Sequence, residues 1–321
     1  MTTLGTAHAE HLLRISDLRT GEFDELLDLA AAMKRRPASW CKTLRSLSIA
    51  CYFSKPSTRT RVSVEAAIHR LGALPIMLRP DELQLGRGEP IADTARVLSS
   101  YCAAIVIRTF AQAEVEAVAA ASSAPVINAL TDEHHPCQAL ADMLTIREHF
   151  GQLEDVAVAY IGDGNNVAHS LMEAGTLAGM DVRIACPPGY EPDADILAGA
   201  ERTAAENGSR IRVVYDPHEA VEGAHVVYTD VWVSMGDEAE QERRLAELGL
   251  YQVTPTLMAQ AAVGAVFLHC LPAHRGQEVA AEVIDGPQSL VFAQAANRLP
   301  TEQAVLYALI TGQWEGSACV S

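Results

Sequence analysis

The sequence predicts an α/β protein made of two doubly wound parallel-sheet domains. Short apolar runs alternate with helix-forming segments along most of the chain, and this alternation is typical of a parallel sheet with helices on both faces. The chain has 321 residues, which is enough for two such domains. Sheets of this kind bind ligands beyond the carboxyl ends of their strands, so we expect a site in the cleft between the two domains.

The apolar runs and the helical segments form two successive series. The first predicts strands at 47–53, 73–78, 103–107 and 125–129, with helices at 15–36, 62–71, from residue 90, at 115–121 and at 136–150. The second predicts strands at 156–161, 182–186, 211–215, 225–228 and 265–269, with helices at 165–180, 194–207 and 301–311. We therefore place the domains at residues 1–150 and 151–297. The C-terminal helix, about residues 298–321, is expected to pack back on the first domain.

Composition and charge argue against several classes of protein. Hydrophobic residues make up 49% and charged residues 20% of the chain, as in globular rather than disordered proteins. The net charge of −17 should repel nucleic acids and anionic membranes, so we expect neither as a partner. The seven cysteines are scattered without metal-binding spacing, and no signal peptide or membrane span is evident. A cytoplasmic protein without a metal is expected.

Residues 53–61, FSKPSTRTR, lie between a predicted strand and a predicted helix. Ser57 and Thr58 are suitable caps for that helix, and Arg59, Thr60 and Arg61 add two guanidinium groups and a further hydroxyl. Helix N-termini and arginines both bind phosphate. A capped helix with solvated arginines is the alternative, but so many hydroxyl and guanidinium groups in five residues favour an anion site.

Three more side chains are expected at the same edge of the first sheet. Arg108 follows the third predicted strand, and His135 and Gln138 follow the fourth, at the start of a helix. His135 and Gln138 are able to hydrogen-bond a carbonyl or an amide group. An ion-paired arginine and a surface histidine pair are the alternatives, but the common edge favours a shared ligand.

Residues 161–166, IGDGNN, form a glycine turn between a predicted strand and a predicted helix. This turn resembles half of a dinucleotide-binding fingerprint. Val167 and Ala168 stand where the third glycine belongs, which argues against a nicotinamide cofactor. Asn165 and Asn166 can cap the helix, or they can hold the amine or carboxylate of an amino acid.

Two later segments carry further polar groups. Asp230 ends a predicted strand and can bind an ammonium group, and the Ser234-Met235-Gly236 loop after it is able to close over a ligand. A plain strand-to-helix connection is the alternative. Cys270 ends the last predicted strand. It suggests a cysteine–histidine hydrolase, but no acyl-enzyme machinery accompanies it in the sequence, and a structural thiol is commoner.

Taken together, these motifs resemble the aspartate/ornithine carbamoyltransferase family. Four blocks carry the resemblance: STRTR at 57–61, HPCQ at 135–138, Asp230 with SMG at 234–236, and HCLP at 269–272. They follow the family's order over a span from about Leu12 to Leu309, and the SMG and HCLP blocks point to its ornithine branch. The resemblance implies transfer of the carbamoyl group of carbamoyl phosphate to the δ-amine of L-ornithine. The products would be L-citrulline and phosphate, formed through a tetrahedral intermediate.

The resemblance also implies roles for individual residues. Those implied to bind carbamoyl phosphate are Ser57, Thr58, Arg59, Thr60, Gln84, Arg108, His135, Gln138, Cys270, Leu271 and Arg298. Those implied to bind ornithine are Asn166, Asp230, Ser234 and Met235, and the implied catalytic residues are Arg59, Arg108, His135, Asp230 and Cys270. Gln84 matches a position that reaches a neighbouring subunit's site, which implies a homotrimer. The first domain would bind carbamoyl phosphate and the second ornithine, without a cofactor or metal.

The residues fit this chemistry on their own. An amine of this kind has a pKa of roughly 10.4 in water. The guanidinium groups of Arg59, Arg108 and Arg298 would lower that pKa, because like charges oppose the ammonium form. Attack by the free amine puts negative charge on the carbamoyl oxygen, for which Thr60, Arg108 and His135 are the expected stabilisers.

Other functions compete with this one. A carbamoyltransferase for another amine, such as putrescine or a modified ornithine, is the nearest, although Asp230 favours a free α-amino acid. Aspartate as the acceptor would need a further cation, and the loop at 80–89 offers Arg87 but no lysine. A catalytically silent carbamoyl-phosphate-binding subunit would be free to lose Cys270, which is present.

One position departs from the family pattern. Ala296 stands where an acidic residue is usual in the family, which puts the local geometry of Arg298 in doubt.

Overall fold

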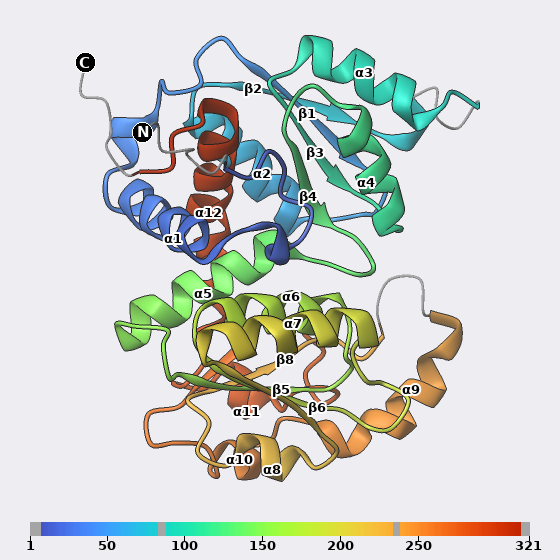
Figure 1. The fold of residues 1–321 in the computed structure, drawn as a ribbon. Helices are drawn as coiled ribbons and strands as arrows, with labels where there is room; N and C mark the ends of the chain where they lie inside the picture. The colour runs from blue at the N-terminus through green and yellow to red at the C-terminus, as the bar shows by residue number, and fades with distance from the viewer. Residues whose placement is uncertain (1–7, 83–87, 234–237, 316–321) are drawn as a thin grey trace. The chain divides into compact units, whose positions relative to one another are not determined.

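The computed structural model describes residues 8–82, 88–233 and 238–315 (Figure 1). The chain divides into two compact units, of which the first comprises Met1–Cys137 with Arg298–Ser321 and the second Gln138–Asn297. Each unit contains one parallel sheet, with strand order β2-β1-β3-β4 in the first and β7-β6-β5-β8-β9 in the second. Helices flank both sheets, so the predicted α/β class with two parallel-sheet domains is confirmed.

The first unit has helices on both faces of its sheet. Helices α3 and α4 bury Tyr52, Ile105 and Ile107 on one face, and α2 lies on the other (Figure 1). Its strands are β1 (Ser48–Phe53), β2 (Leu74–Leu78), β3 (Ala104–Arg108) and β4 (Val126–Leu130). Its helices are η1 (Ile15–Asp17), α1 (Thr20–Arg35), η2 (Pro37–Trp40), α2 (Arg59–Arg70), η3 (Pro80–Glu82), α3 (Ile91–Tyr101) and α4 (Gln112–Ala121).

The second unit repeats this layered arrangement. Helices α6 and α7 lie on one face of its sheet and α8, α10 and α11 on the other (Figure 1). Its strands are β5 (Ala157–Ile161), β6 (Asp181–Ala185), β7 (Arg210–Val214), β8 (Val226–Thr229) and β9 (Val266–His269). Its helices are α6 (Asn166–Leu177), α7 (Ala194–Asn207), α8 (Pro217–Val221), η5 (Glu238–Glu240), α9 (Gln241–Leu248), η6 (Gly249–Tyr251), α10 (Pro255–Met258) and α11 (Ala281–Ile284).

The helix predicted at 15–36 is divided in the structure. Its first turn is the separate η1, and α1 begins at Thr20. Leu18, between them, is extended (φ −92°, ψ 142°). The Glu22 carboxylate accepts a hydrogen bond from the Arg19 backbone N–H (2.8 Å). Glu22 thus satisfies a donor that precedes the helix, as the third residue of a capping box does, and α1 starts there.

Two helices, α5 (Pro136–Phe150) and α12 (Val291–Thr311), run through the division between the units. The start of α5 at Pro136 agrees with the prediction. By contrast, α12 begins at Val291 rather than at residue 301, and Pro300 lies inside it. Proline favours the first turn of a helix, which is why the sequence predicted the later start. Consequently Arg298 lies within the helix, which ends at Thr311.

The strand order reverses once in each sheet, between β1 and β3 and between β5 and β8. Phe53, the last residue of β1, pairs with Arg108, the last residue of β3. In the second sheet Thr229, the last residue of β8, pairs with Ile161 of β5 and with His269 of β9. The residues after these strands therefore leave each sheet side by side, and open α/β sheets bind ligands at such reversals.

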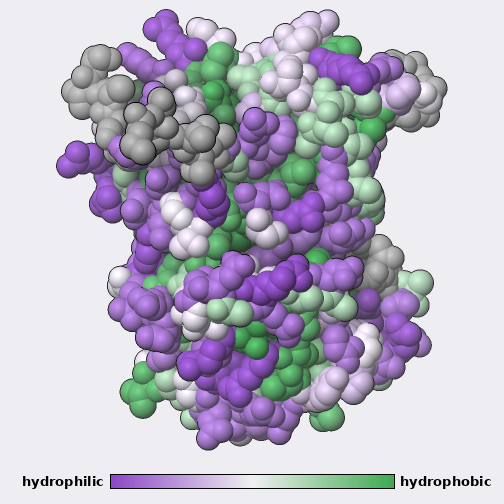
Figure 2. All heavy atoms as spheres, in the orientation of Figure 1, coloured by the Kyte–Doolittle hydropathy of each residue, from purple (hydrophilic) through white to green (hydrophobic). Residues whose placement is uncertain are grey.

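Hydrophilic residues predominate on the face of the molecule shown in Figure 2. Within the described ranges, no helix is long and apolar enough to cross a membrane.

Four cysteines, Cys51, Cys102, Cys137 and Cys186, are buried as free thiols. Burial raises the pKa of Cys137 and of Cys186 to about 12. These four thiols are packing groups rather than reactive ones.

Candidate active site

Ser57 and Thr58 form the start of α2, beyond the carboxyl end of β1. Ser57 Oγ accepts a hydrogen bond from the Thr60 backbone N–H (3.2 Å), so Ser57 caps the helix. Thr58 occupies the N-cap position with helical backbone angles (φ −84°, ψ −54°) and makes no side-chain cap bond. Of the two predicted caps, the structure uses Ser57. Thr58 stays exposed at the positive end of the helix dipole, where anions bind.

Two buried guanidinium groups converge on the Thr60 hydroxyl. Arg108 Nη1 and Arg298 Nη2 each lie 3.4 Å from Thr60 Oγ1, and all three residues are buried. Arg108 comes from the end of β3 and Arg298 from α12, so groups far apart in the sequence meet at the start of α2. In a chain of net charge −17, this local concentration of positive charge suits an anion such as phosphate.

His135 lies in the same positive environment. Burial lowers the pKa of His135 well below its usual range, and the charges of Arg298, Arg108 and Arg59 lower it further. The imidazole is therefore neutral near pH 7 and can donate one hydrogen bond without adding a charge. Below pH 6.5 the unfolded chain binds a proton that the folded His135 does not, so this residue lowers the stability of the protein on acidification.

Arg298 has a carboxylate partner one turn further along α12. Glu302 Oε1 accepts hydrogen bonds from Arg298 Nη2 and from Ser63 Oγ, both at 2.9 Å. Ala296 therefore does not leave Arg298 without an acidic neighbour. Glu302 Oε2 is buried without a hydrogen bond, and burial raises the pKa of Glu302 to about 7 although Arg298 and Ser63 act in the other direction.

Replacing Glu302 with glutamine should raise the free energy of unfolding at pH 8. A glutamate pKa of 4.5 becomes about 7 in the folded state, so the stability that the bound proton supplies is lost as the pH rises from 4.5 through 7. The difference between these two pKa values corresponds to about 3 kcal/mol of the free energy of unfolding. Glutamine avoids this loss and keeps an oxygen for Arg298. We expect a gain of about 1–3 kcal/mol at pH 8 by urea unfolding, falling to near zero at pH 5.

Glu22→Gln is the matched control, with the opposite sign. Burial alone would raise the pKa of Glu22, but hydrogen bonds from Arg19 and Ala9 lower it to about 2. Glu22 therefore contributes stability above pH 4.5 that is lost as the pH falls toward 2. The Glu22 variant should be destabilised at pH 8. If the Glu302 variant also lowers the urea midpoint at that pH, the interpretation of Glu302 is wrong.

Asp230 and Cys270 lie side by side at the ends of β8 and β9 in the second unit. Asp230 Oδ1 accepts a hydrogen bond from Cys270 Sγ (2.9 Å), and its Oδ2 accepts one from Asn165 Nδ2 (3.0 Å). Asp230 is buried, and both of these bonds come from neutral groups. A buried carboxylate in this setting attracts a cation, and an ammonium group can also donate hydrogen bonds to it.

His269 and Glu278 support the backbone next to Cys270. His269 Nδ1 accepts a hydrogen bond from the Leu271 N–H (2.8 Å), and its Nε2 lies 3.2 Å from Glu278 Oε1. A carboxylate is an acceptor, so the ring proton belongs on Nε2. The ring thereby helps to hold Leu271 in the left-handed region (φ 59°), which residues other than glycine seldom adopt.

The same contacts argue against rival chemistries. Asp230, His269 and Cys270 offer metal-ligating atoms within 4.8 Å of one another, but both ring nitrogens of His269 are already engaged. For that reason His269 is also unsuited to be the base of a cysteine hydrolase. A dinucleotide is disfavoured because Asn165 Oδ1 accepts two backbone N–H groups of the first turn of α6 (2.9 and 3.3 Å), which a pyrophosphate would need.

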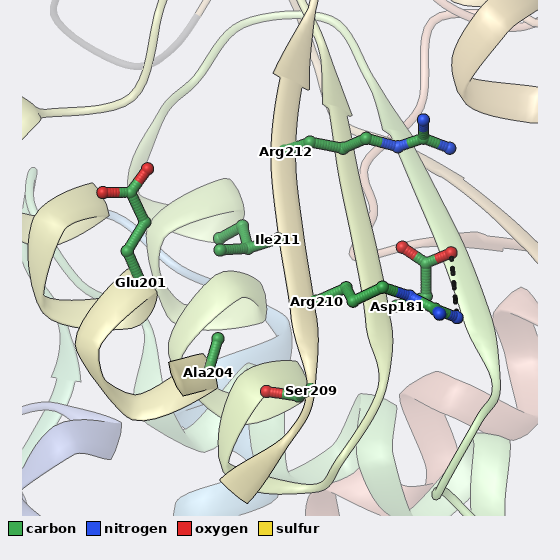
Figure 3. Close-up of a pocket in the computed structure, with 7 residues that line it drawn as sticks. All are labelled: Asp181, Glu201, Ala204, Ser209, Arg210, Ile211 and Arg212. Atoms are coloured by element: carbon green, nitrogen blue, oxygen red, sulfur yellow. Dashed lines mark ion pairs between the residues drawn. The ribbon is translucent and has the colours of Figure 1, made fainter. Parts of the chain in front are cut away.

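An open pocket of about 520 Å³ lies at the edge of the second sheet. Asp181 and Arg210 begin β6 and β7, so this pocket is at the amino ends of the strands and away from Asp230. Arg210 pairs with Asp181 (3.8 Å), and Figure 3 shows Arg210 and Arg212 pointing away from Ile211. The lining side chains do not converge, and we assign no ligand to this pocket.

Some predicted site residues are not tested by these contacts. Gln84, Ser234 and Met235 lie outside the described residues. Gln138 lies in the first turn of α5, and Asn166 is the first residue of α6. Arg59 is the first residue of α2, and its charge acts on His135 as noted above.

The sequence reasoning missed Glu302, Glu278 and Asp142. A signal for Glu302 was available, because it follows Arg298 by four residues and such pairs face each other on a helix. Glu278 and Asp142 are joined to the site segments by hydrogen bonds to His269 and Gln138. Their spacing in the sequence gave no comparable signal for either contact.

The two parts of the chain match the two domains of one enzyme family. Residues 10–148 match the carbamoyl-P binding domain of aspartate/ornithine carbamoyltransferase, and residues 154–309 match its Asp/Orn binding domain. The chain therefore belongs to the aspartate/ornithine carbamoyltransferase family.

Individual relatives carry a narrower name. The ornithine carbamoyltransferase of Methanothermobacter thermautotrophicus is 54% identical over 301 residues, which are 94% of this chain and 99% of the relative. That of Clavibacter sepedonicus is 53% identical over 301 residues, or 94% of this chain and 98% of the relative. The solved ornithine carbamoyltransferase from Pyrococcus furiosus is similar with a TM-score of 0.91 at 48% identity, covering 96% of this chain and 99% of that one.

Proposed function

We propose that this chain transfers the carbamoyl group of carbamoyl phosphate to the δ-amine of L-ornithine, giving L-citrulline and phosphate. Relatives named ornithine carbamoyltransferase match it at about half identity over nearly the whole chain. We assign carbamoyl phosphate to residues 1–150, with the end of α12 packed against them, and ornithine to residues 151–297. The matched domain descriptions support the choice of ligand for each part, and the first compact unit includes Arg298–Ser321.

The observation that carries the choice of ornithine is the environment of Asp230. The family includes enzymes for aspartate and for ornithine, and these acceptors differ in the charge of their side chains. A buried carboxylate bonded to Cys270 and Asn165 favours an amino acid held by its α-ammonium group. A second substrate carboxylate would be repelled by Asp230.

The proposed reaction is direct displacement at the carbamoyl carbon. Ser57, Thr58, Arg59 and Thr60 hold the phosphate at the start of α2, where the helix dipole and guanidinium groups oppose its charge. The free δ-amine forms the new N–C bond, and the carbamoyl oxygen becomes negative. Arg108 and the neutral His135 stabilise that oxygen. The C–O bond to phosphate then breaks, and the amine proton is lost.

Assays with carbamoyl phosphate and one of four amines test this function. Ornithine, putrescine, lysine and aspartate are each supplied, and the ureido product is identified by mass spectrometry. Citrulline from ornithine, at a rate well above those of the other three products, is the expected result. No citrulline from ornithine would refute the proposal. A silent carbamoyl-phosphate-binding subunit would give no ureido product from any amine and would still bind carbamoyl phosphate.

We also propose a homotrimer that works in the cytoplasm. The support for a trimer is the resemblance of Gln84 to a family position that reaches a neighbouring subunit. Sedimentation equilibrium should give a mass near three times 34.4 kDa. A monomer at micromolar concentration that retains full activity would contradict the proposal of shared sites.

A further inference from the structure

Thr131 is the centre of a buried hydrogen-bond network that lies just before His135 in the first unit. Its Oγ1 accepts a hydrogen bond from the His134 backbone N–H (3.0 Å) and donates one to Gln112 Oε1 (2.8 Å). The Thr131 backbone N–H donates to His134 O (2.8 Å), so residues 131–134 form a closed turn between β4 and α5. Gln112 is the first residue of α4 and is buried. The turn is therefore attached to α4 through the Thr131 hydroxyl.

The direction of each hydrogen bond in this network follows from its neighbours. Asn128 Nδ2 donates to Leu13 O (2.8 Å), which fixes the orientation of the Asn128 amide. The same nitrogen lies 3.3 Å from the Gln112 side chain, which must therefore present its oxygen there. That oxygen takes the proton of the Thr131 hydroxyl, and a lone pair of Thr131 then accepts the His134 N–H. This position thus needs a side chain that is both a donor and an acceptor, as a hydroxyl group is.

His135 lies between this turn and the start of α5. Pro136 begins the helix, and a residue before proline is restricted to extended backbone angles. Because the turn is closed on one side and the helix begins on the other, the backbone of His135 has little freedom. The turn therefore helps to set where the imidazole lies. A displacement of about 1 Å in a catalytic group can cost about 10²-fold in rate.

We propose that Thr131 is a positioning residue, which holds the imidazole of His135 where it stabilises the carbamoyl oxygen in the transition state. This inference rests on the proposed function. Thr131 acts without contacting the substrate, since its hydroxyl bonds Gln112 and the His134 N–H. A contact that strengthens in the transition state raises kcat more than it lowers KM. The loss of Thr131 should therefore appear mainly in kcat.

Two substitutions of Thr131 test this role. Thr131→Val keeps the shape of the side chain and removes the hydroxyl, whereas Thr131→Ser keeps the hydroxyl. We expect Thr131→Val to lower kcat about 10- to 100-fold and to change KM for carbamoyl phosphate less than about threefold. Thr131→Ser should keep kcat within about threefold of wild type, because both hydrogen bonds remain. Gln112→Met removes the anchor from α4 and should lower kcat in the same way, which keeps the test available if the valine variant does not fold.

A double-mutant cycle with His135→Ala separates positioning from a general loss of structure. If Thr131 acts through His135, adding Thr131→Val to His135→Ala should lower kcat by less than about a further twofold, because residues that act as a unit are not additive. Val115→Ala is the matched control for stability. Val115 lies fully buried on the same helix as Gln112 and packs in the apolar core. Its truncation should lower the urea midpoint and leave kcat within about twofold of wild type.

An NMR titration of His135 gives a readout that does not depend on the acceptor. Burial lowers the pKa of His135, and the charges of Arg298, Arg108 and Arg59 lower it further. Both effects weaken if the ring is displaced, so the pKa of His135 should rise toward its usual range in Thr131→Val. The spectrum of His135→Ala identifies the signal, which is missing there.

Three results would overturn the inference. They are a Thr131→Val variant with kcat within about twofold of wild type, a full additional loss of kcat in the His135→Ala background, and an unchanged pKa of His135 in Thr131→Val. The same rise in that pKa in Val115→Ala would also overturn it, because any loss of stability would then have this effect. A wild type that makes no citrulline would refute the proposed function, and the titration would still decide whether Thr131 holds the ring of His135.

Discussion

Replacing Arg108 with methionine is expected to lower kcat/KM for carbamoyl phosphate by about 10²- to 10³-fold, the usual effect of removing one donor from a developing oxyanion. Arg108 is buried at the end of β3, and its Nη1 shares the Thr60 hydroxyl with Arg298. Methionine can fill the space of the arginine stem with a flexible apolar chain. The loss of activity therefore reflects the missing charge and donors rather than a cavity.

The same variant should leave a spectroscopic mark on His135. Arg108 is one of three guanidinium groups that lower the pKa of this residue beyond the effect of burial. Removing one of them should raise the pKa of His135 toward its usual range, because a neighbouring cation opposes imidazolium formation. An NMR titration of the ring measures this shift. The midpoint of thermal unfolding should stay the same or rise, since a repulsion among like charges has been reduced.

Arg96→Met is the control for loss of an arginine. Arg96 is exposed on α3 and pairs with Asp93 (2.9 Å), so its removal should change activity by less than about twofold, as for most surface ion pairs. An Arg108 variant with activity within threefold of wild type would refute the assignment of Arg108 to the site. An inactive Arg108 variant that has also lost its cooperative unfolding transition would contradict the claim that the loss of activity reflects only the missing charge and donors.

The local signals in the sequence predicted most of the fold. The run at 47–53 corresponds to β1 (Ser48–Phe53), and Pro136 begins α5 as predicted, because apolar runs and proline act over a few residues. The edge shared by Arg108 and the start of α2 was also predictable, because parallel strands present their carboxyl ends together. Helix α12 was harder, since Pro300 gives the same local signal at the start of a helix as inside one.

The contacts that complete the two clusters could not be predicted in this way. Glu302 meets Ser63, and Asp142 meets Tyr228 and Gln294, across separations that no periodicity relates. Buried polar groups are placed by the need to pair every donor and acceptor in the folded protein. That need depends on the complete packing, and so it is seen only in three dimensions. The substrate roles of these clusters stay predictions until variants are measured.

Replacing Asp230 with asparagine is expected to lower kcat/KM for ornithine by about 10²- to 10³-fold, because it removes one partner of a buried, hydrogen-bonded charge pair. Asparagine has the same size and can keep an oxygen toward the Asn165 amide, which bonds Asp230 at 3.0 Å. Carbamoyl phosphate affinity should stay close to the wild-type value, since Asp230 itself is not among the proposed ligands of that substrate. Steady-state kinetics and calorimetry measure these two quantities.

The analogue 5-aminopentanoate shows whether Asp230 binds the α-ammonium group. This compound keeps the reacting amine and the carboxylate of ornithine and lacks only the α-amine. The wild type should strongly prefer ornithine, and the Asp230→Asn variant should lose most of that preference because the two acceptors then differ little in charge interaction. Asp193→Asn removes one negative charge from the same unit and should keep the preference, because asparagine replaces aspartate well as the N-cap of α7. An unchanged preference in Asp230→Asn would mean that another group holds the α-amine, and the choice of ornithine over aspartate would lose its physical basis.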